Sequence, residues 1–428
     1  MKSMNNFKFN CKSTNKEINF YYFLSLGSNI GNKIENIDTA IEKLKDIGCK
    51  ILQIAPYYKT KPLLPNDADK NYNKMFYNTV IEIETNFEPH EFLKKIKQIE
   101  LKMGRPKKHQ HWSPRIIDID ILYCKQGIKP IFIAEKTLSI PHKEIFNRAF
   151  VLDPLAQIAP NLVINSKNIL SESKKHRQHQ SAKMKIININ NNSFSGDGIT
   201  DPMEIEKKIK YLTKKRVAFI DIGAESTNPL AKPISSKEEI DRLKKSNIIN
   251  TIKKYKTNGV KFSIDTYHPE TADFAIKNGF NVINDVNGFK DEKMWNIMQK
   301  NNNICAVIMH SIVPNGTKKM CINNNINIIE VLNKWVENVI EKANFYKINK
   351  NRIVIDYGIG FGKTAEQDLF IINNFNKINN NSLLVLIGHS RKNFLKLLGA
   401  KNIDDRKKIT KKVSLKLTKH GADILRLH

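Results

Sequence analysis

Two aspartates separated by one residue, Asp118 and Asp120, form the pattern in this sequence with the clearest chemistry. They lie in the alternating segment RIIDIDILY (115–123), so a strand would place both carboxylates on one face, about 7 Å apart, and the isoleucines on the other. Paired carboxylates repel unless a cation lies between them, and Mg²⁺ bound by carboxylates and substrate phosphates fits this arrangement. A solvent-exposed strand face is the alternative. Four upstream residues, suited to a nucleoside triphosphate, favour the metal site: Arg105, Lys107, Trp112 and Arg115.

In the second half of the chain, polar side chains end a series of short runs rich in Ile and Val. In a barrel of parallel strands, such residues meet at the carboxyl ends of the strands, where active sites are built. A ring of them predicts a site for a polar, anionic, nitrogen-rich ligand. Its members are Asn188, Asp221, Asp265, Asn284, His310, Asp356, Ser390, Arg426 and His428.

The runs themselves predict the architecture of this half. Near-continuous aliphatic runs are typical of strands buried on both faces, and the helical segments between them supply crossovers. Eight such units in about 245 residues predict a (β/α)₈ TIM barrel, which lacks an obvious eighth helix after the last run. The predicted strands are residues 185–190, 217–223, 260–266, 281–286, 305–310, 352–358, 383–390 and 422–428.

The first half predicts a different fold class, an α+β sandwich with helices on a mostly antiparallel sheet. We expect strands at 20–27, 50–60, 75–85 and 115–124 and helices at 36–44 and 89–104. Residues 165–183 are polar and basic without periodicity, which is typical of a linker. We therefore divide the chain into a domain at 20–165, a linker at 166–183 and a barrel at 184–428.

Composition limits the function classes. The net charge of +29 would suit a nucleic-acid binder, but Lys and Asn are frequent throughout and no basic stripe alternates with aromatics, so compositional drift is the better interpretation. The five scattered cysteines argue against disulfides and a zinc site. No apolar run is long enough to cross a bilayer. We expect a cytoplasmic protein that binds neither nucleic acid nor membrane.

Six motifs in the first half together resemble hydroxymethyldihydropterin pyrophosphokinase. They are LSLGSNIGN (24–32), YYKTKPL (57–63), FYNTV (76–80), IELKMGR (99–105), WSPRIIDIDIL (112–122) and IPH…NRAFVLDPL (140–155). The resemblance implies a ferredoxin-like sandwich that transfers a pyrophosphoryl group from ATP to 6-hydroxymethyl-7,8-dihydropterin.

The resemblance also implies roles for individual residues. Asp118 and Asp120 would hold two Mg²⁺ ions, and Trp112 would belong to a loop that closes over the phosphates. The pterin would lie between Phe76 and Phe150. The remaining roles are phosphate contacts by Arg105, Arg115 and His142, recognition of the pterin edge by Thr60 and Asn78, and orientation of nearby cations by Glu100.

The second half resembles dihydropteroate synthase. The motifs are ININNNSFSGDG (187–198), DIGAESTNP (221–229), SIDT (263–266), INDV (283–286), VIMH (307–310), DYGIGFGK (356–363), GHSRK (388–392) and LRLH (425–428). The implied reaction condenses the pterin pyrophosphate with para-aminobenzoate to 7,8-dihydropteroate. Both halves would then catalyse consecutive steps of folate synthesis.

The implied synthase roles fall on the strand ends. The pterin would contact Asp221, Asp265, Asn284, Asp356 and Lys392. One Mg²⁺ on the pyrophosphate would be held by Asn188, with Arg426 and His428 clamping the oxygens; Phe361 and Arg391 would wall the pocket, and Thr227 and Ser390 would lie toward the aminobenzoate.

Some residues depart from the synthase pattern. Asn190–Asn192 replace the usual Thr-Pro-Asp, Asn228 replaces Arg, and Tyr357 replaces Pro. A second interpretation is therefore an active pyrophosphokinase fused to a degenerate barrel that only binds pterin. A nucleic-acid binder and a pterin-binding methyltransferase are weaker alternatives. Because no helix follows the last strand, we expect a second barrel or the first domain to cover its apolar face. Of these, we favour a homodimer through the barrel.

Overall fold

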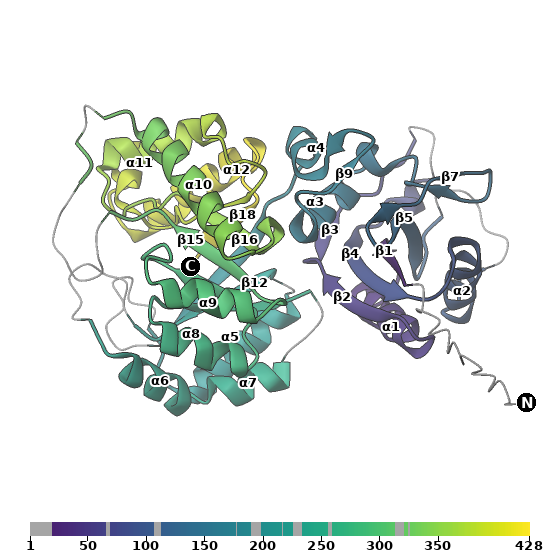
Figure 1. The fold of residues 1–428 in the computed structure, drawn as a ribbon, viewed down its shortest axis with the longest axis horizontal. Coiled ribbons are helices and arrows are strands. Elements are labelled where there is room, and N and C mark those ends of the chain that lie inside the picture. Colours follow the sequence, from purple (N-terminus) through teal and green to yellow (C-terminus); the bar gives the residue numbers. More distant parts are fainter. Residues whose placement is uncertain are drawn as a thin grey trace, which may run out of the picture.

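The chain folds into two domains, and the strand that carries the aspartate pair, β5 (Asp118–Gln126), belongs to the sheet of the first (Figure 1). The computed structural model describes residues 19–65, 69–106, 113–176, 178–189, 198–215, 217–225, 233–255, 259–312, 321–323 and 326–428. The sheet is antiparallel with strand order β2-β4-β1-β5-β6, and β3 pairs with β4. Its strands are β1 (Phe20–Ser28), β2 (Lys50–Ile54), β3 (Tyr58–Thr60), β4 (Phe76–Thr85), β5 (Asp118–Gln126) and β6 (Lys129–Pro130).

Helices cover both faces of this sheet, and the period-2 alternation of the strands explains why. Tyr22, Leu24 and Leu26 of β1 pack with helices α1 (Lys33–Asp46) and α2 (Pro89–Lys102). Phe23 packs on the opposite face with helix α3 (Ala149–Ile158). Short elements complete the domain: β7 (Ile133–Ala134), β8 (Ser139–Ile140), β9 (Val163–Ile164), β10 (Lys167–Asn168) and α4 (Ile169–Lys175).

Two strands predicted for the first domain differ from the structure by more than one residue. The strand predicted over 50–60 is divided into β2 and β3, because Pro56 lies between them and offers no N–H for the ladder. The strand predicted from Arg115 begins at Asp118, because the backbone of Arg115 is bonded to Asn29 instead. The Arg115 N–H donates to Asn29 Oδ1 at 2.7 Å, and its carbonyl accepts from the Asn29 N–H at 3.2 Å.

The second domain is the predicted closed barrel, with all eight strands parallel. They are β11 (Ala182–Asn188), β12 (Phe219–Gly223), β13 (Lys261–Asp265), β14 (Val282–Asp285), β15 (Cys305–Met309), β16 (Ile353–Asp356), β17 (Leu384–Ile387) and β18 (Ile424–Leu427). The surrounding helices are α5 (Pro202–Lys214), α6 (Ser236–Lys245), α7 (Ile248–Tyr255), α8 (Pro269–Lys277), α9 (Glu292–Lys300), α10 (Ile328–Phe345), α11 (Ala365–Asn374) and α12 (Ile403–Lys419). None of the helices in the described ranges is long and apolar enough to span a membrane.

Helices α3 and α4 lie between the sheet and the barrel (Figure 1). Leu152 and Leu155 of α3 and Leu170 of α4 belong to one apolar core with Met184 and Phe219, at the amino ends of the barrel strands. Residues 166–183, where we expected a linker, thus contain a helix with buried Ile169, Leu170 and Ser173. Hydrophobic periodicity did not predict this helix, because it is short, mostly polar and buries few residues.

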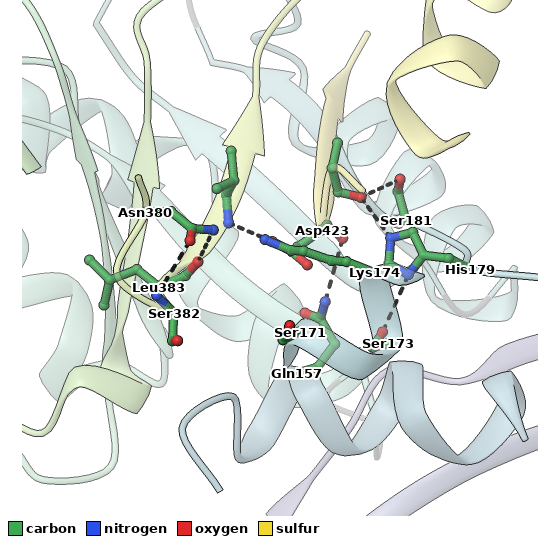
Figure 2. Close-up of polar contacts among 12 residues, drawn as sticks. Gln157, Ser171, Ser173, Lys174, His179, Ser181, Asn380, Ser382, Leu383 and Asp423 are labelled. Carbon is green, nitrogen blue, oxygen red and sulfur yellow. Dashed lines mark hydrogen bonds and ion pairs between the residues drawn. The ribbon is translucent and has the colours of Figure 1, made fainter. Parts of the chain in front are cut away.

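Buried polar contacts join the same elements (Figure 2). Lys174 of α4 pairs with Asp423 at 2.9 Å, and the Asp423 carboxylate, 1% exposed, also accepts the Val385 N–H at 2.8 Å. The His179 ring bonds to Asp153 Oδ1 through Nδ1 at 2.9 Å and to the Ala422 carbonyl through Nε2 at 3.2 Å. Both ring nitrogens face acceptors, so the doubly protonated imidazolium satisfies both. The two domains therefore meet through ordered, desolvated contacts.

Candidate active sites

A cavity of about 670 Å³ opens on the first domain, above the face of β1 and β5 that carries Ser25, Gly27 and the aspartate pair. Strand alternation places both carboxylates on this face, while Ile119 and Ile121 pack with α1 and α2. The predicted same-face pair is therefore confirmed. Nine of the residues named from the sequence line this one cavity: Thr60, Phe76, Asn78, Arg105, Arg115, Asp118, Asp120, His142 and Phe150.

Two arginines hold Asp118. Arg105 Nη1 donates to Oδ1 at 2.6 Å, and Arg115 Nη1 donates to Oδ2 at 2.8 Å. Burial would raise the pKa of Asp118, but Arg115 and Arg105 outweigh it and hold that pKa below its usual value. Burial and the neighbouring Asp118 charge raise the pKa of Asp120 to about 6. The two carboxylates therefore differ in basicity although they share a face.

Glu100 lies behind this pair and orients one of its arginines. The Glu100 carboxylate is 2% exposed and accepts from Arg105 Nη1 at 2.7 Å and from the Ile119 N–H at 2.8 Å. Lys97 Nζ donates to its other oxygen at 2.9 Å. Glu100 thus links α2, β5 and the cation that touches Asp118.

A hydrogen-bonded polar pair and two aromatic side chains also line the cavity. Asn78 Nδ2 donates to Thr60 Oγ1 at 2.7 Å, joining β4 to β3. Gly27, paired with Asn78 across the ladder, has no room for a side chain, because a Cβ there would lie 2.6 Å from Asn78 Oδ1. Phe76 and Phe150 also line the cavity. Side chains of these types can recognise a flat ring by its edge and its faces.

His142 is neutral in this cavity. Its Nδ1 accepts the Glu144 N–H at 3.1 Å, so the ring proton lies on Nε2. Burial lowers the pKa of His142 to about 4, and the nearby Arg148 adds to the effect. Neutral His142 can therefore donate a hydrogen bond without titrating near neutral pH.

Sequence reasoning missed four cations that line this cavity: Lys61, Lys97, Lys143 and Arg148. Arg148 Nη1 lies 3.7 Å from Asp120 Oδ2, and its guanidinium lies 5.8 Å from the centre of the Phe150 ring. These residues lie within or beside the motifs of the first half. A positive charge beside an expected phosphate site was the signal that could have identified them. Trp112 and Lys107 lie outside the described residues.

At the carboxyl ends of the barrel strands, Arg426 bridges two carboxylates. Its Nε donates to Asp221 Oδ2 at 2.7 Å and its Nη2 to Asp265 Oδ2 at 2.6 Å. Asn284 Nδ2 donates to the same Asp221 oxygen at 3.0 Å. Burial raises the pKa of Asp265 to about 7, with Asp221 adding to the rise and Arg426 opposing it. Strands β12, β13, β14 and β18 thus bring four predicted residues together.

Asp356 and Lys392 complete this group from β16 and from the segment after β17. Asp356 Oδ1 accepts the Gly358 N–H at 2.9 Å, and burial raises its pKa. Burial lowers the pKa of Lys392 to about 8. The Lys392 ammonium lies 4.2 Å from the centre of the Phe361 ring. A flat ligand here would meet carboxylates, an amide and a cation.

The remaining predicted barrel residues lie at the same end. His428 Nδ1 lies 3.3 Å from Ser390 Oγ, and Lys185 Nζ donates to the His428 carbonyl oxygen at 2.6 Å. Arg391 follows Ser390 in a left-handed conformation with φ of 60°. Asn188 ends β11 and forms a bridge to Gly198. Residues outside the described part of the chain are Thr227, Asn190–Asn192 and Asn228.

Family models match the two halves separately. A model described as 7,8-dihydro-6-hydroxymethylpterin-pyrophosphokinase matches residues 23–160, and one described as Pterin binding enzyme matches residues 184–428. The barrel is similar in structure to a dihydropteroate synthase from Anaplasma phagocytophilum with bound 6-hydroxymethylpterin-monophosphate. That likeness has a TM-score of 0.51 at 28% identity and covers 58% of this chain and 93% of the other.

Relatives match along almost the whole chain. The folate synthesis bifunctional protein of Arabidopsis thaliana is 30% identical over 95% of this chain and 92% of its own length. The folic acid synthesis protein fol1 of Pneumocystis carinii is 31% identical over 97% of this chain, which spans 59% of that protein and 49% of its Schizosaccharomyces pombe counterpart. The chain therefore belongs to the family of folate synthesis bifunctional proteins, with a domain of the pyrophosphokinase family followed by a pterin-binding barrel.

Proposed function

We propose that this chain catalyses two consecutive transferase steps of folate synthesis. In the first, ATP gives a pyrophosphoryl group to the hydroxymethyl oxygen of 6-hydroxymethyl-7,8-dihydropterin, with release of AMP. In the second, the amine of para-aminobenzoate displaces pyrophosphate from that product to form 7,8-dihydropteroate. The observation that carries the proposal is the presence of two separate charged sites, one in each family-matched domain. We retain 20–165 and 184–428 as the proposed domain bounds.

The donor set of the first site fits Mg²⁺. Asp118 and Asp120 present hard oxygens to the cavity from one face. Two carboxylates leave several coordination positions of such an ion open, which substrate phosphates and water would fill. Two Mg²⁺ ions, when bound, would neutralise the phosphate charge.

The chain itself would position the first reaction. Arg105, Arg115 and Arg148 would bind phosphate oxygens, and His142 would donate from Nε2. Thr60 and Asn78 would bind the pterin edge while Phe76 and Phe150 stack on its faces, and Trp112 would belong to a closing loop. This is catalysis by alignment and charge neutralisation, so no nucleophilic side chain is required.

The barrel would stabilise positive charge on the pterin. Loss of pyrophosphate leaves a cationic methylene, and Asp221, Asp265 and Asp356 surround this region with carboxylates. Asn284 and Lys392 would bind ring atoms, and Phe361 and Arg391 would wall the pocket. Arg426 and His428 would bind pyrophosphate oxygens, with Thr227 and Ser390 near the aminobenzoate. Asn188 offers one amide oxygen, which would hold one Mg²⁺ together with pyrophosphate and water.

A coupled assay tests the proposal. Wild-type chain with ATP, hydroxymethyldihydropterin and para-aminobenzoate should yield AMP and dihydropteroate. Asp118→Ala should abolish AMP formation but leave condensation of supplied pterin pyrophosphate intact. If supplied pterin pyrophosphate gives no dihydropteroate, the barrel is the degenerate pterin-binding scaffold; if no AMP forms, the first activity is refuted.

We also propose a homodimer through the barrel. Ile403 and Leu415 of α12 are 63% and 61% exposed, and Leu397 and Leu398 of the adjoining segment are 48% and 41% exposed. Exposed apolar side chains on this helix and the segment before it are the kind of surface that an interface would bury. Sedimentation should give a dimer that Leu415→Glu converts to monomer; a wild-type monomer would contradict the proposal.

A further inference from the structure

The loop that follows β16 surrounds the ammonium group of a buried lysine, Lys363. This residue is 6% exposed, and its Nζ donates to the carbonyl oxygens of Gly358 at 3.0 Å, Phe361 at 3.1 Å and His310 at 3.4 Å. All three acceptors are backbone atoms from two separate strand ends. Burying an ammonium group is costly, so a lysine at this place needs a reason beyond packing.

The path of the loop makes these carbonyls converge. Gly358, Gly360 and Gly362 all have left-handed φ angles, of 65°, 79° and 68°. A side chain at Gly358 would overlap the His310 carbonyl, so the approach of the two strand ends depends on glycine. Asp368 of α11 fixes the middle of the loop by accepting the Gly360 N–H at 2.9 Å. Lys363 and Asp368 are thus its two charged anchors.

This loop sets the position of Lys392 and its aromatic neighbour. A Cβ at Gly360 would lie 3.1 Å from Lys392 Cδ, so the loop backbone rests on the aliphatic part of Lys392. Phe361, whose carbonyl Lys363 holds, places its ring 4.2 Å from the Lys392 ammonium. Displacing the Phe361 backbone would therefore displace both residues.

We propose that Lys363 is a positioning residue for the barrel reaction: it holds the 358–363 loop so that Phe361 and Lys392 meet the pterin in a fixed geometry. The inference rests on the proposed synthase function. Lys363 binds its own backbone loop and acts through Lys392.

Electrostatics supply a readout that a purely structural role would not move. Burial lowers the pKa of Lys363, Asp368 and Asp356 oppose this effect, and the Lys392 charge adds to it, which leaves the pKa at about 8. The same repulsion acts on Lys392, whose pKa of about 8 reflects burial and Arg426, opposed by Asp368, Asp356 and Asp265. Removing the Lys363 charge should raise the pKa of Lys392. The alkaline limb of the condensation pH profile should then move to higher pH.

The test uses the full chain with supplied pterin pyrophosphate and para-aminobenzoate. For Lys363→Met we expect kcat to fall roughly tenfold to a hundredfold, the scale of a misplacement near 1 Å, with the alkaline limb moved upward. AMP formation by the first domain should be unchanged, which reports correct folding. Lys363→Arg keeps the charge and should keep the limb in place. The exposed Lys377→Met is the matched control and should behave as wild type.

Wild-type kcat and an unmoved limb in Lys363→Met would overturn the inference. If Lys363→Met fails to fold, the same two measurements, kcat and the position of the alkaline limb, are made on Lys363→Gln. This variant keeps a hydrogen-bond donor but lacks the charge. If wild type forms no dihydropteroate, the proposed function fails separately. Quenching of pterin fluorescence on binding then tests the loop: weaker binding by Lys363→Met supports the inference, and equal binding overturns it.

Discussion

Replacing Lys174 by Met should reveal how strongly the two domains depend on each other. Lys174 is 21% exposed and pairs at 2.9 Å with Asp423, which is 1% exposed. Coulomb's law at this distance, with an effective dielectric of about 20, gives an attraction of about 6 kcal/mol, much of which offsets desolvation of the two groups. Lys174→Met leaves the buried Asp423 carboxylate with the Val385 N–H and without its cation. Losing one partner of such a pair costs about 3–5 kcal/mol, so we expect that loss in the free energy of unfolding.

Urea denaturation, followed by AMP formation and by dihydropteroate formation in parallel, measures this loss. Because α3, α4 and the barrel share one apolar core, both activities should disappear in a single transition, which moves to lower urea in the variant. Lys175→Met is the matched control: Lys175 is 69% exposed and pairs with Glu172 on the same helix, so its removal should change stability by less than about 0.5 kcal/mol. A loss below about 1 kcal/mol in Lys174→Met would refute the reasoning, as would separate transitions for the two activities in wild type.

Three further outcomes follow from single residues. Burial lowers the pKa of His179, but its bond to Asp153 outweighs this and raises the pKa above 6.5, so the stabilisation by His179 is complete below that pH and is lost as pH rises through the raised value. The stability difference between wild type and His179→Gln should therefore shrink from pH 6 to pH 9, and a constant difference would contradict the imidazolium assignment. Arg148→Ala should lower kcat/KM of pyrophosphoryl transfer by roughly tenfold to a hundredfold, since a charge-assisted hydrogen bond contributes about 1.5–3 kcal/mol, with condensation as the internal control. Unaltered transfer would remove Arg148 from the phosphate site. NMR titration should place the pKa of His142 near 4, and a value above 6 would show that the ring is not desolvated as the cavity implies.

Short-range pattern determined much of this protein. Runs of Ile and Val alternating with helical segments were enough to predict all eight barrel strands, because strands buried on both faces require aliphatic residues at every position. Strand periodicity likewise determined that Asp118 and Asp120 share a face, since that depends only on their separation of two residues. Nine of the residues named from the sequence line one cavity in the structure.

Tertiary structure decided how the charges are paired and how the domains meet. Arg426 bridges Asp221 and Asp265, which precede it by 205 and 161 residues, and no local pattern encodes which carboxylate an arginine will reach. The burial of Lys363 likewise depends on strand ends that only barrel closure brings together. The sequence of helix α4 is typical of a linker because its side chains are mostly polar. The helix nevertheless packs on the barrel through a few buried residues. Such contacts depend on how distant segments of the chain are arranged in space, so local sequence patterns do not predict them.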